Sequence, residues 1–343
     1  MKPVLLLAAI AALTVTGSLP SKLYIHASHL VAVEPGRRLN LRCLGTGQPT
    51  VIMESGLGET SMAWRKVQGQ IAAFTQACSY DRAGLGFSDA ARRPSTALNA
   101  ADDLQRLVAV AGIPRPVVLV GHSVGGLYVT VYAGLHGADV AGMVLVDPAF
   151  AEQNHEMGTQ IMSAQERAIA KSAVLSQIAE LKTCAVMAHQ GKLGPNTVSP
   201  PDCLGKDPDP TLNAELIREF VRPKTQDALL SESQNVRVPV EGDYSESALE
   251  AVRIQHDFQN MPLIVLTHST APYSTMSEET NSAREAAWRA GHDRLASYSS
   301  AGQSIVVPNS GHYIQLDQPQ AVIDAIHTVL EQARRRGPAP ARR

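Results

Sequence analysis

Residues 116–130 read PVVLVGHSVGGLYVT, and this stretch decides how the chain around it is arranged. The apolar run before the glycines predicts a buried strand, and the apolar segment after them predicts a helix. Between the two, Gly121, Ser123 and Gly125 form a G-x-S-x-G pattern. A serine on a sharp turn from strand to helix projects its hydroxyl above the carboxyl end of a sheet, and glycines beside it permit close backbone approach. We therefore expect Ser123 to be a nucleophile.

Strand and helix patterns alternate on both sides of this stretch. The segments that predict strands are LVAV, RLNLRC, TVIME, ACSY, PVVLVG, AGMVLVD, PLIVLT and SIVVP. The first two surround the turn at residues 34–37 and predict a hairpin, and most of the others are separated by helical patterns. Such alternation is typical of parallel pairing. We expect an α/β fold with an eight-stranded, mostly parallel sheet flanked by helices.

The alternation stops after the sixth strand, where helical patterns occupy about 110 residues. We expect a helical cap insertion without strands at residues 149–260. The expected α/β core comprises residues 28–148 and 261–334, and residues 335–343 are expected to form a disordered basic tail. The helical pieces of the insertion are predicted around residues 160–190, 211–233 and 245–258.

The first residues have the pattern of a secretory signal. Lys2 precedes an apolar run from Val4 to Val15, and the small, turn-forming residues TGSLPS follow. We expect residues 1–27 to be a signal peptide or an N-terminal anchor, with cleavage near Ser18 or Ala27, and the protein to be extracytoplasmic, either secreted or periplasmic.

Composition excludes several classes of function. The 343 residues carry 30 Lys+Arg and 32 Asp+Glu, a formal charge of −2, without the basic stripe typical of nucleic-acid binding. No apolar window after the leader is long enough to cross a bilayer. The histidines and cysteines lack the spacing of a zinc site, and no motif implies a cofactor. The sequence does not indicate an oligomeric state.

A serine hydroxyl is a weak nucleophile and needs a base within hydrogen-bond reach. Of the 11 histidines, His312 is the best placed, because it follows the strand SIVVP and should lie at the carboxyl edge of the sheet. His122 adjoins the nucleophile and is expected to pack or to line a pocket. The remaining histidines, His268 among them, are expected to be solvated or satisfied in the core.

These motifs together resemble the α/β-hydrolase fold family, in particular its serine esterase and lipase-like members. The resemblance covers about residues 30–332 and rests on ESGLG, YDRAGLGFSD, GHSVGG, VLVDP and SGHYIQLDQP, in that order. In this family the chain order is serine, acid, histidine, in agreement with Ser123 preceding His312. Haloalkane dehalogenases and epoxide hydrolases of the same fold use aspartate at the elbow, so Ser123 argues against both.

The resemblance leaves two places for the acid. The commonest family position lies shortly after the penultimate strand, PLIVLT, but the first acids there are Glu278 and Glu279. Asp147 instead ends AGMVLV, and a subset of the family, similar to pancreatic lipases, takes its acid from that strand. We favour Asp147 and keep Glu278 or Glu279 as the alternative.

The family also implies two backbone donors for a developing oxyanion. The N–H of Val124, which follows the nucleophile, is one, and the N–H of Leu57 in the loop Gly56-Leu57-Gly58 is the other. The loop of residues 81–84, Asp-Arg-Ala-Gly, is expected to be a structural turn beside the site.

The four cysteines allow three pairings on the sequence alone. In the fold that the chain resembles, the strands carrying Cys43 and Cys78 are neighbours. This implies a disulfide between Cys43 and Cys78, and leaves Cys184 and Cys203 to pair within the insertion.

The expected activity is cleavage of small-molecule carboxylic esters through an acyl-enzyme, by Ser123, His312 and Asp147. The alternatives are an acyltransferase, a lactonase or amidase, a carbon–carbon bond hydrolase, or a ligand-binding relative without turnover.

Overall fold

The described structure is built on one eight-stranded sheet, as expected. This computed structural model describes residues 21–194, 197, 203–270 and 276–336, so most of the predicted leader and the tail beyond Arg336 lie outside the described residues. The strands are β1 (His29–Glu34), β2 (Arg37–Leu44), β3 (Val51–Glu54), β4 (Ala77–Tyr80), β5 (Val117–His122), β6 (Val140–Val146), β9 (Leu263–His268) and β10 (Gly302–Val307). Their order in space is β1-β2-β4-β3-β5-β6-β9-β10. The β1–β2 and β2–β4 pairs are antiparallel, and all other neighbours are parallel.

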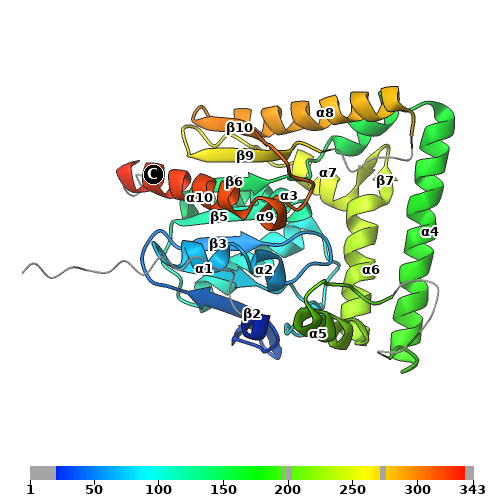
Figure 1. The fold of residues 1–343 in the computed structure, drawn as a ribbon, viewed down its shortest axis with the longest axis horizontal. Coiled ribbons are helices and arrows are strands. Elements are labelled where there is room, and N and C mark those ends of the chain that lie inside the picture. The colour runs from blue at the N-terminus through cyan, green and yellow to red at the C-terminus, as the bar shows by residue number, and fades with distance from the viewer. Residues whose placement is uncertain (1–20, 195–196, 198–202, 271–275, 337–343) are drawn as a thin grey trace, which may run out of the picture.

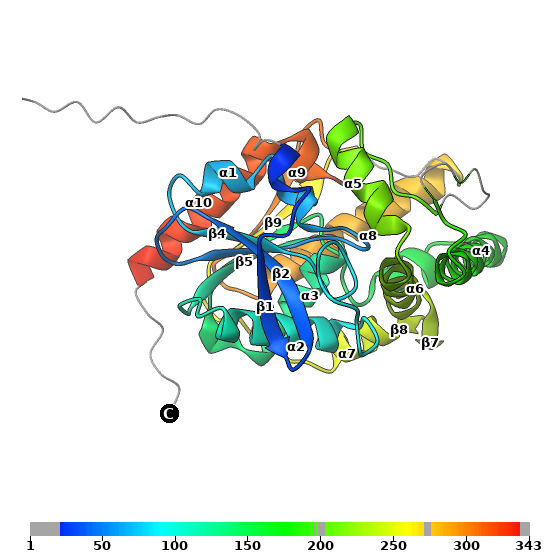
Figure 2. The same cartoon turned by 90° about the horizontal axis from the view of Figure 1, so that it is seen from below.

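Apolar side chains on both faces of the sheet hold the flanking helices. Along β5, Val117 and Leu119 join one core and Val118 and Val120 join the other, because alternate side chains of a strand point to opposite faces. Figure 2 shows helices on either side of the strands. One face is covered by α2 (Ala97–Val110), α3 (Val124–Leu135) and α8 (Glu278–Ser297), and the other by α1 (Gln68–Ile71) and α10 (Pro319–Arg336). The carboxyl ends of the parallel strands therefore meet at one edge, where such sheets place their ligands.

Most of the segment between β6 and β9 is helical. In Figure 1, α4 and α6 stand at one end of the sheet and run across the direction of its strands. The elements of this cap are a π-helical turn (His155–Thr159), α4 (Ala164–His189), α5 (Pro210–Phe220), α6 (Pro223–Arg237) and α7 (Glu246–Val252). The helix expected over residues 211–233 is two helices, because Pro223 begins a new one at its first turn.

The expectation that the insertion contains no strands is wrong. β7 (Pro239–Glu241) and β8 (Tyr244–Ser245) pair antiparallel around Gly242, which has φ +56°. Glycine adopts this left-handed conformation without steric cost, so the Glu-Gly-Asp sequence at residues 241–243 favours a tight hairpin. Within the described ranges, no helix is both long and apolar enough to cross a bilayer.

The structure contains both expected disulfides. Cys43 and Cys78 face each other across the β2–β4 pair, with their Cα atoms 4.0 Å apart. Cys184, near the end of α4, is bonded to Cys203, and their Cα atoms are 5.5 Å apart. One bond therefore joins neighbouring strands of the core, and the other closes a loop inside the cap.

Candidate active site

Ser123 lies on the turn between β5 and α3, with φ 53° and ψ −125°. This left-handed φ is uncommon for a residue other than glycine and is characteristic of strained functional turns. The glycines around it are required by close contacts. A Cβ on Gly121 would lie 2.5 Å from the carbonyl oxygen of Gly125, and one on Gly125 would lie 2.5 Å from that of Ser55. The G-x-S-x-G spacing therefore has a steric cause in this fold.

The structure brings Ser123, His312 and Asp147 together at the carboxyl edge of the sheet. The Nε2 atom of His312 lies 2.9 Å from Ser123 Oγ, and its Nδ1 atom lies 2.5 Å from Asp147 Oδ2. Asp147 directly follows β6, and His312 lies on the loop after β10. Glu278 and Glu279, the alternative acids, are exposed in the first turn of α8 and do not contact Ser123 or His312.

The carboxylate of Asp147 is fully buried and accepts four hydrogen bonds. Its donors are Nδ1 of His312, Nδ1 of His268 at 2.7 Å, the backbone N–H of His268 at 3.2 Å and Nε1 of Trp288 at 3.1 Å. Burial alone would raise the pKa of Asp147, but the hydrogen bonds from His268 and His312 outweigh it and hold that pKa well below its usual range. Asp147 is therefore a carboxylate at any physiological pH.

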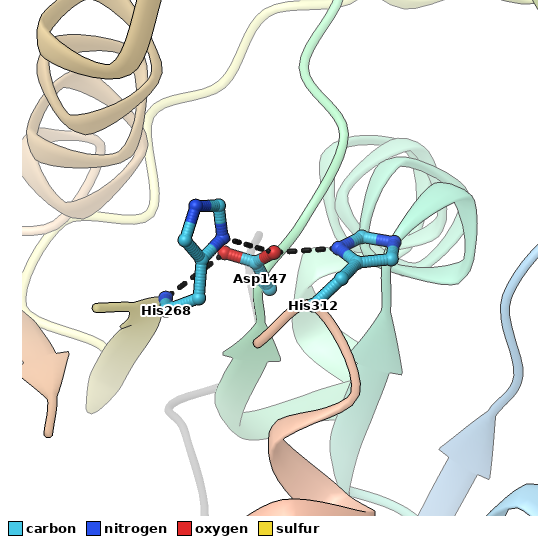
Figure 3. A group of neighbouring side chains, drawn as sticks. All are labelled: Asp147, His268 and His312. Carbon is cyan, nitrogen blue, oxygen red and sulfur yellow. Dashed lines mark hydrogen bonds and ion pairs between the residues drawn. The ribbon is translucent and has the colours of Figure 1, made fainter. Parts of the chain in front are cut away.

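His268 was not expected at the site. It is the last residue of β9, and Figure 3 shows its ring on one side of Asp147 with the ring of His312 on the other. Its second ring nitrogen, Nε2, lies 3.0 Å from Glu285 Oε1 on α8. One sequence signal could have found it, namely that His268 ends a predicted strand. Because β6 and β9 are parallel neighbours, the residue that ends β9 lies beside Asp147, which follows β6.

Ligand-type atoms of Asp147, His268 and His312 all lie within 4.8 Å of one another, which is close enough to suggest a metal site. The nitrogen–oxygen separations of 2.5 and 2.7 Å are those of direct hydrogen bonds. Two ligands on one metal ion at about 2 Å are held farther apart than this. The geometry is therefore that of a hydrogen-bonded carboxylate.

The loop after β3 carries Leu57, one of the two expected oxyanion donors. Neither the N–H of Leu57 nor that of Val124 has an acceptor among the residues that the structure describes. The N–H of the next residue, Gly58, donates to Glu232 Oε2 of α6 at 2.8 Å.

Arg82, in the loop expected to be a structural turn, binds the loop that follows β3. Its guanidinium donates to the carbonyl oxygens of Ser55 and Gly56, at 2.7 and 2.6 Å, and pairs with Glu54 and Glu232. Burial disfavours the charge of Arg82, but these two carboxylates outweigh it and raise its pKa. The buried cluster connects the core, the loop of Leu57 and the cap.

His122 is fully buried beside the nucleophile and is more than a packing residue. Its Nδ1–H donates to Glu59 at 3.0 Å, and its Nε2–H donates to the carbonyl oxygen of His312 at 3.0 Å. Burial opposes its protonation, but Glu59 outweighs this and raises the pKa of His122. The ion pair joins the end of β5 to the loop after β3, and the bond to the His312 carbonyl oxygen joins it to the loop that carries His312.

Two curated proteins are similar in sequence to this chain. The curated protein YqjL of Bacillus subtilis, itself uncharacterized, is 24% identical over 285 residues, which cover 83% of this chain and 85% of YqjL. The probable transporter efuK of Hormonema carpetanum is 37% identical over 107 residues, which are 30% of this chain and only 15% of that protein.

Solved structures of the same fold include two enzymes. A thermophilic esterase from Thermogutta terrifontis superimposes with a TM-score of 0.56 at 19% identity, covering 89% of this chain and 97% of that one. A loop variant of the haloalkane dehalogenase DbeA from Bradyrhizobium elkanii gives 0.62 at 16% identity, covering 90% and 96%. At such identities the likeness shows the fold alone. The alpha/beta hydrolase family matches residues 51–325, and the chain belongs to that family.

Proposed function

We propose that the protein is a serine hydrolase that cleaves small carboxylic esters through an acyl-enzyme. The observation that carries this proposal is the continuous chain of hydrogen bonds from Ser123 Oγ through His312 to Asp147, with separations of 2.9 and 2.5 Å. A hydroxyl, an imidazole and a buried carboxylate in this order are the parts of a catalytic triad. Membership of a family with esterase neighbours is consistent with it.

In the proposed reaction, Ser123 Oγ attacks the ester carbonyl while Nε2 of His312 takes its proton. His312 then gives that proton to the departing alcohol, and the acyl group remains on Ser123. A water molecule, deprotonated by His312, attacks the acyl-enzyme. The bond between the acyl carbon and Ser123 Oγ then breaks, His312 returns the proton to Ser123 Oγ, and the acid is released. Asp147 keeps the Nδ1–H tautomer of His312 in place and stabilises the imidazolium that forms in each step.

The N–H groups of Leu57 and Val124 would stabilise the oxyanion in both tetrahedral intermediates. Val124 is the first residue of α3, so the helix N-terminus adds its positive partial charge at the same point. One such donor is worth about 3–4 kcal/mol of the activation barrier.

A fluorophosphonate probe and a panel of p-nitrophenyl esters of increasing chain length test the proposal. The wild-type protein should be labelled and should hydrolyse at least the shorter esters, and Ser123→Ala should do neither. A wild-type protein that folds but is not labelled would favour a ligand-binding relative without turnover. Labelling without ester hydrolysis would point to transfer of the acyl group to an acceptor other than water, or to an amide substrate.

We further propose that the protein works outside the cytoplasm. The two disulfides support this, because such bonds persist in oxidising compartments. Peptide mapping under non-reducing conditions, on protein exported to the periplasm, should recover the Cys43–Cys78 and Cys184–Cys203 pairs. Four thiols open to alkylation would contradict the proposal.

A further inference from the structure

The environment of His268 differs from that of an ordinary buried histidine. Its side chain is 1% exposed, and both of its ring nitrogens face carboxylates. Nδ1 lies 2.7 Å from Asp147 Oδ2, and Nε2 lies 3.0 and 3.2 Å from the two oxygens of Glu285. A neutral imidazole has only one N–H, so one nitrogen would present a lone pair to an anion. With both carboxyl groups ionised, both contacts are favourable only when the ring is an imidazolium.

The charges around His268 agree with a protonated ring. Asp147 and Glu285 are 0% and 13% exposed, and without a cation between them two carboxylates would face each other in the protein interior. Burial disfavours the charge of His268, but the hydrogen bonds to Asp147 and Glu285 outweigh it and raise its pKa to about 9.

The other groups that face this cluster come from α8 and from the loop after β10. The Nε atom of Arg289 lies 3.6 Å from Glu285 Oε1, and Arg289 is 44% exposed. It therefore adds a positive charge, screened by solvent, at the Glu285 end of the cluster. His292 accepts from Thr267 Oγ1 and donates to the carbonyl oxygen of Pro148, and burial lowers its pKa to about 4, so it stays neutral. His312 contacts the same oxygen of Asp147 that His268 contacts.

We propose that His268 is a positioning residue of the triad, an imidazolium that is held by Glu285 and that orients the Asp147 carboxylate and opposes part of its negative charge. The inference rests on the proposed function, because it concerns how Asp147 acts on His312. A carboxylate without a second cation would hold the proton of His312 more tightly. A positive charge on His268 therefore weakens the attraction of Asp147 for that proton.

The variant His268→Asn separates charge from shape. The amide nitrogen of asparagine occupies about the place of Nδ1 and can still donate to Asp147, but it has no charge and does not reach Glu285. Glu285→Gln removes the anion that retains the proton on His268 and leaves the histidine in place. Asp293→Asn is the matched control, because Asp293 is an exposed acid on the same helix and forms no hydrogen bond or ion pair with His268, Asp147 or Glu285 among the described residues.

The first measurement is the pH dependence of kcat/KM for p-nitrophenyl butyrate, followed at the isosbestic wavelength of p-nitrophenol. In His268→Asn the acid limb should move to higher pH by about one unit, the order expected for losing a unit charge roughly 5 Å from the base. Glu285→Gln should move the limb in the same direction and Asp293→Asn should not move it. A purely structural His268 would lower the amount of active enzyme and leave the limb where it is, which would overturn the proposal.

The second measurement does not depend on turnover. An imidazole NMR titration of the folded Ser123→Ala protein should show His268 doubly protonated at pH 7, with its resonances assigned by their absence from the Ser123→Ala/His268→Asn spectrum. A neutral His268 at pH 7 would overturn the proposal. The two failures are distinguishable: ester hydrolysis that survives in Ser123→Ala removes the proposed function, whereas an unmoved acid limb in an enzyme that Ser123→Ala abolishes removes only the role of His268.

Discussion

Single substitutions at Ser123 and His312 test the proposed chemistry at the scale of one residue. Ser123→Ala and His312→Ala should each lower kcat for p-nitrophenyl esters by several orders of magnitude and leave the circular dichroism spectrum unchanged. The members of a triad act as a unit, so the double variant should be little worse than either single one. Additive losses would mean that the two side chains do not act in the same step.

The acid is tested by three neutral substitutions. Asp147→Asn should lower kcat by about 10⁴-fold, because the amide no longer stabilises the imidazolium and favours the wrong tautomer of His312. Glu278→Gln and Glu279→Gln should have wild-type kinetics, since both side chains are exposed. Should one of these be the inactive variant instead, the acid would have to come from α8 and Asp147 would be a turn residue.

Stability should depend on pH through His268. Its folded pKa of about 9 lies above the unfolded value of 6.5, so the stabilisation from its protonated form is complete below about pH 6.5 and is lost as the pH rises to 9. The loss is on the order of 3 kcal/mol. Urea unfolding between pH 6 and 9.5 should therefore show a steeper decline for the wild type than for His268→Asn. Parallel curves for the two proteins would contradict this assignment.

At the scale of elements, the contact between α6 and the loop after β3 connects the cap to the proposed oxyanion donors. Glu232 accepts from Gly58 N–H and pairs with Arg82, which itself donates to the loop carbonyls of Ser55 and Gly56. Glu232→Gln keeps the shape and removes the charge. It should lower kcat roughly tenfold with little change in KM, because a shift of this loop weakens one oxyanion contact that is made only in the transition state.

The control for this variant is Asp227→Asn, which removes an exposed acid from the same helix, where it pairs with the exposed His189. It should leave kcat unchanged. Glu232→Gln should also lower the melting temperature, since it leaves buried Arg82 with a single carboxylate partner. A lower melting temperature with unchanged kcat would show that α6 holds the cap without acting on the site.

At the scale of the whole molecule, the segment before β1 is packed between the core and the cap. Tyr24 is 1% exposed, contacts Met62 and Leu212, and donates its hydroxyl to Gln68 at 3.0 Å. Cleavage of a leader near Ser18 would keep these contacts, and cleavage near Ala27 would remove them. We predict that the mature chain begins near Ser18, which N-terminal sequencing of exported protein checks.

A matched pair of truncations measures the contribution of Tyr24. A chain that starts at Leu19 keeps the contacts of Tyr24 and is the reference. A chain that starts at Ser28 should be less stable by about 3 kcal/mol, the usual cost of removing a buried aromatic side chain. Equal stabilities would mean that the segment is dispensable and that either cleavage position is tolerated.

Local patterns were sufficient to predict the sheet, the turn at Ser123 and the places of His312 and Asp147 at its edge. Each of these depends on residues close together in the chain: alternation of strand and helix patterns, glycines at a fixed spacing, and polar residues that directly follow strands. The pairing of Cys43 with Cys78 needed the resemblance to a known fold as well, because it depends on which strands are neighbours.

Other parts of the site depend on contacts between segments that are far apart in the sequence, and local patterns do not specify which of these segments become neighbours. His268 and Asp147 are 121 residues apart, and they meet because β6 and β9 pair across the cap insertion. Glu285 and Trp288 reach the same cluster because α8 packs with one face against β9. The link from Arg82 to Glu232 spans 150 residues and exists only when the cap is docked. Which buried charges pair with each other depends on how whole helices and strands pack, so these pairs are determined by the tertiary structure.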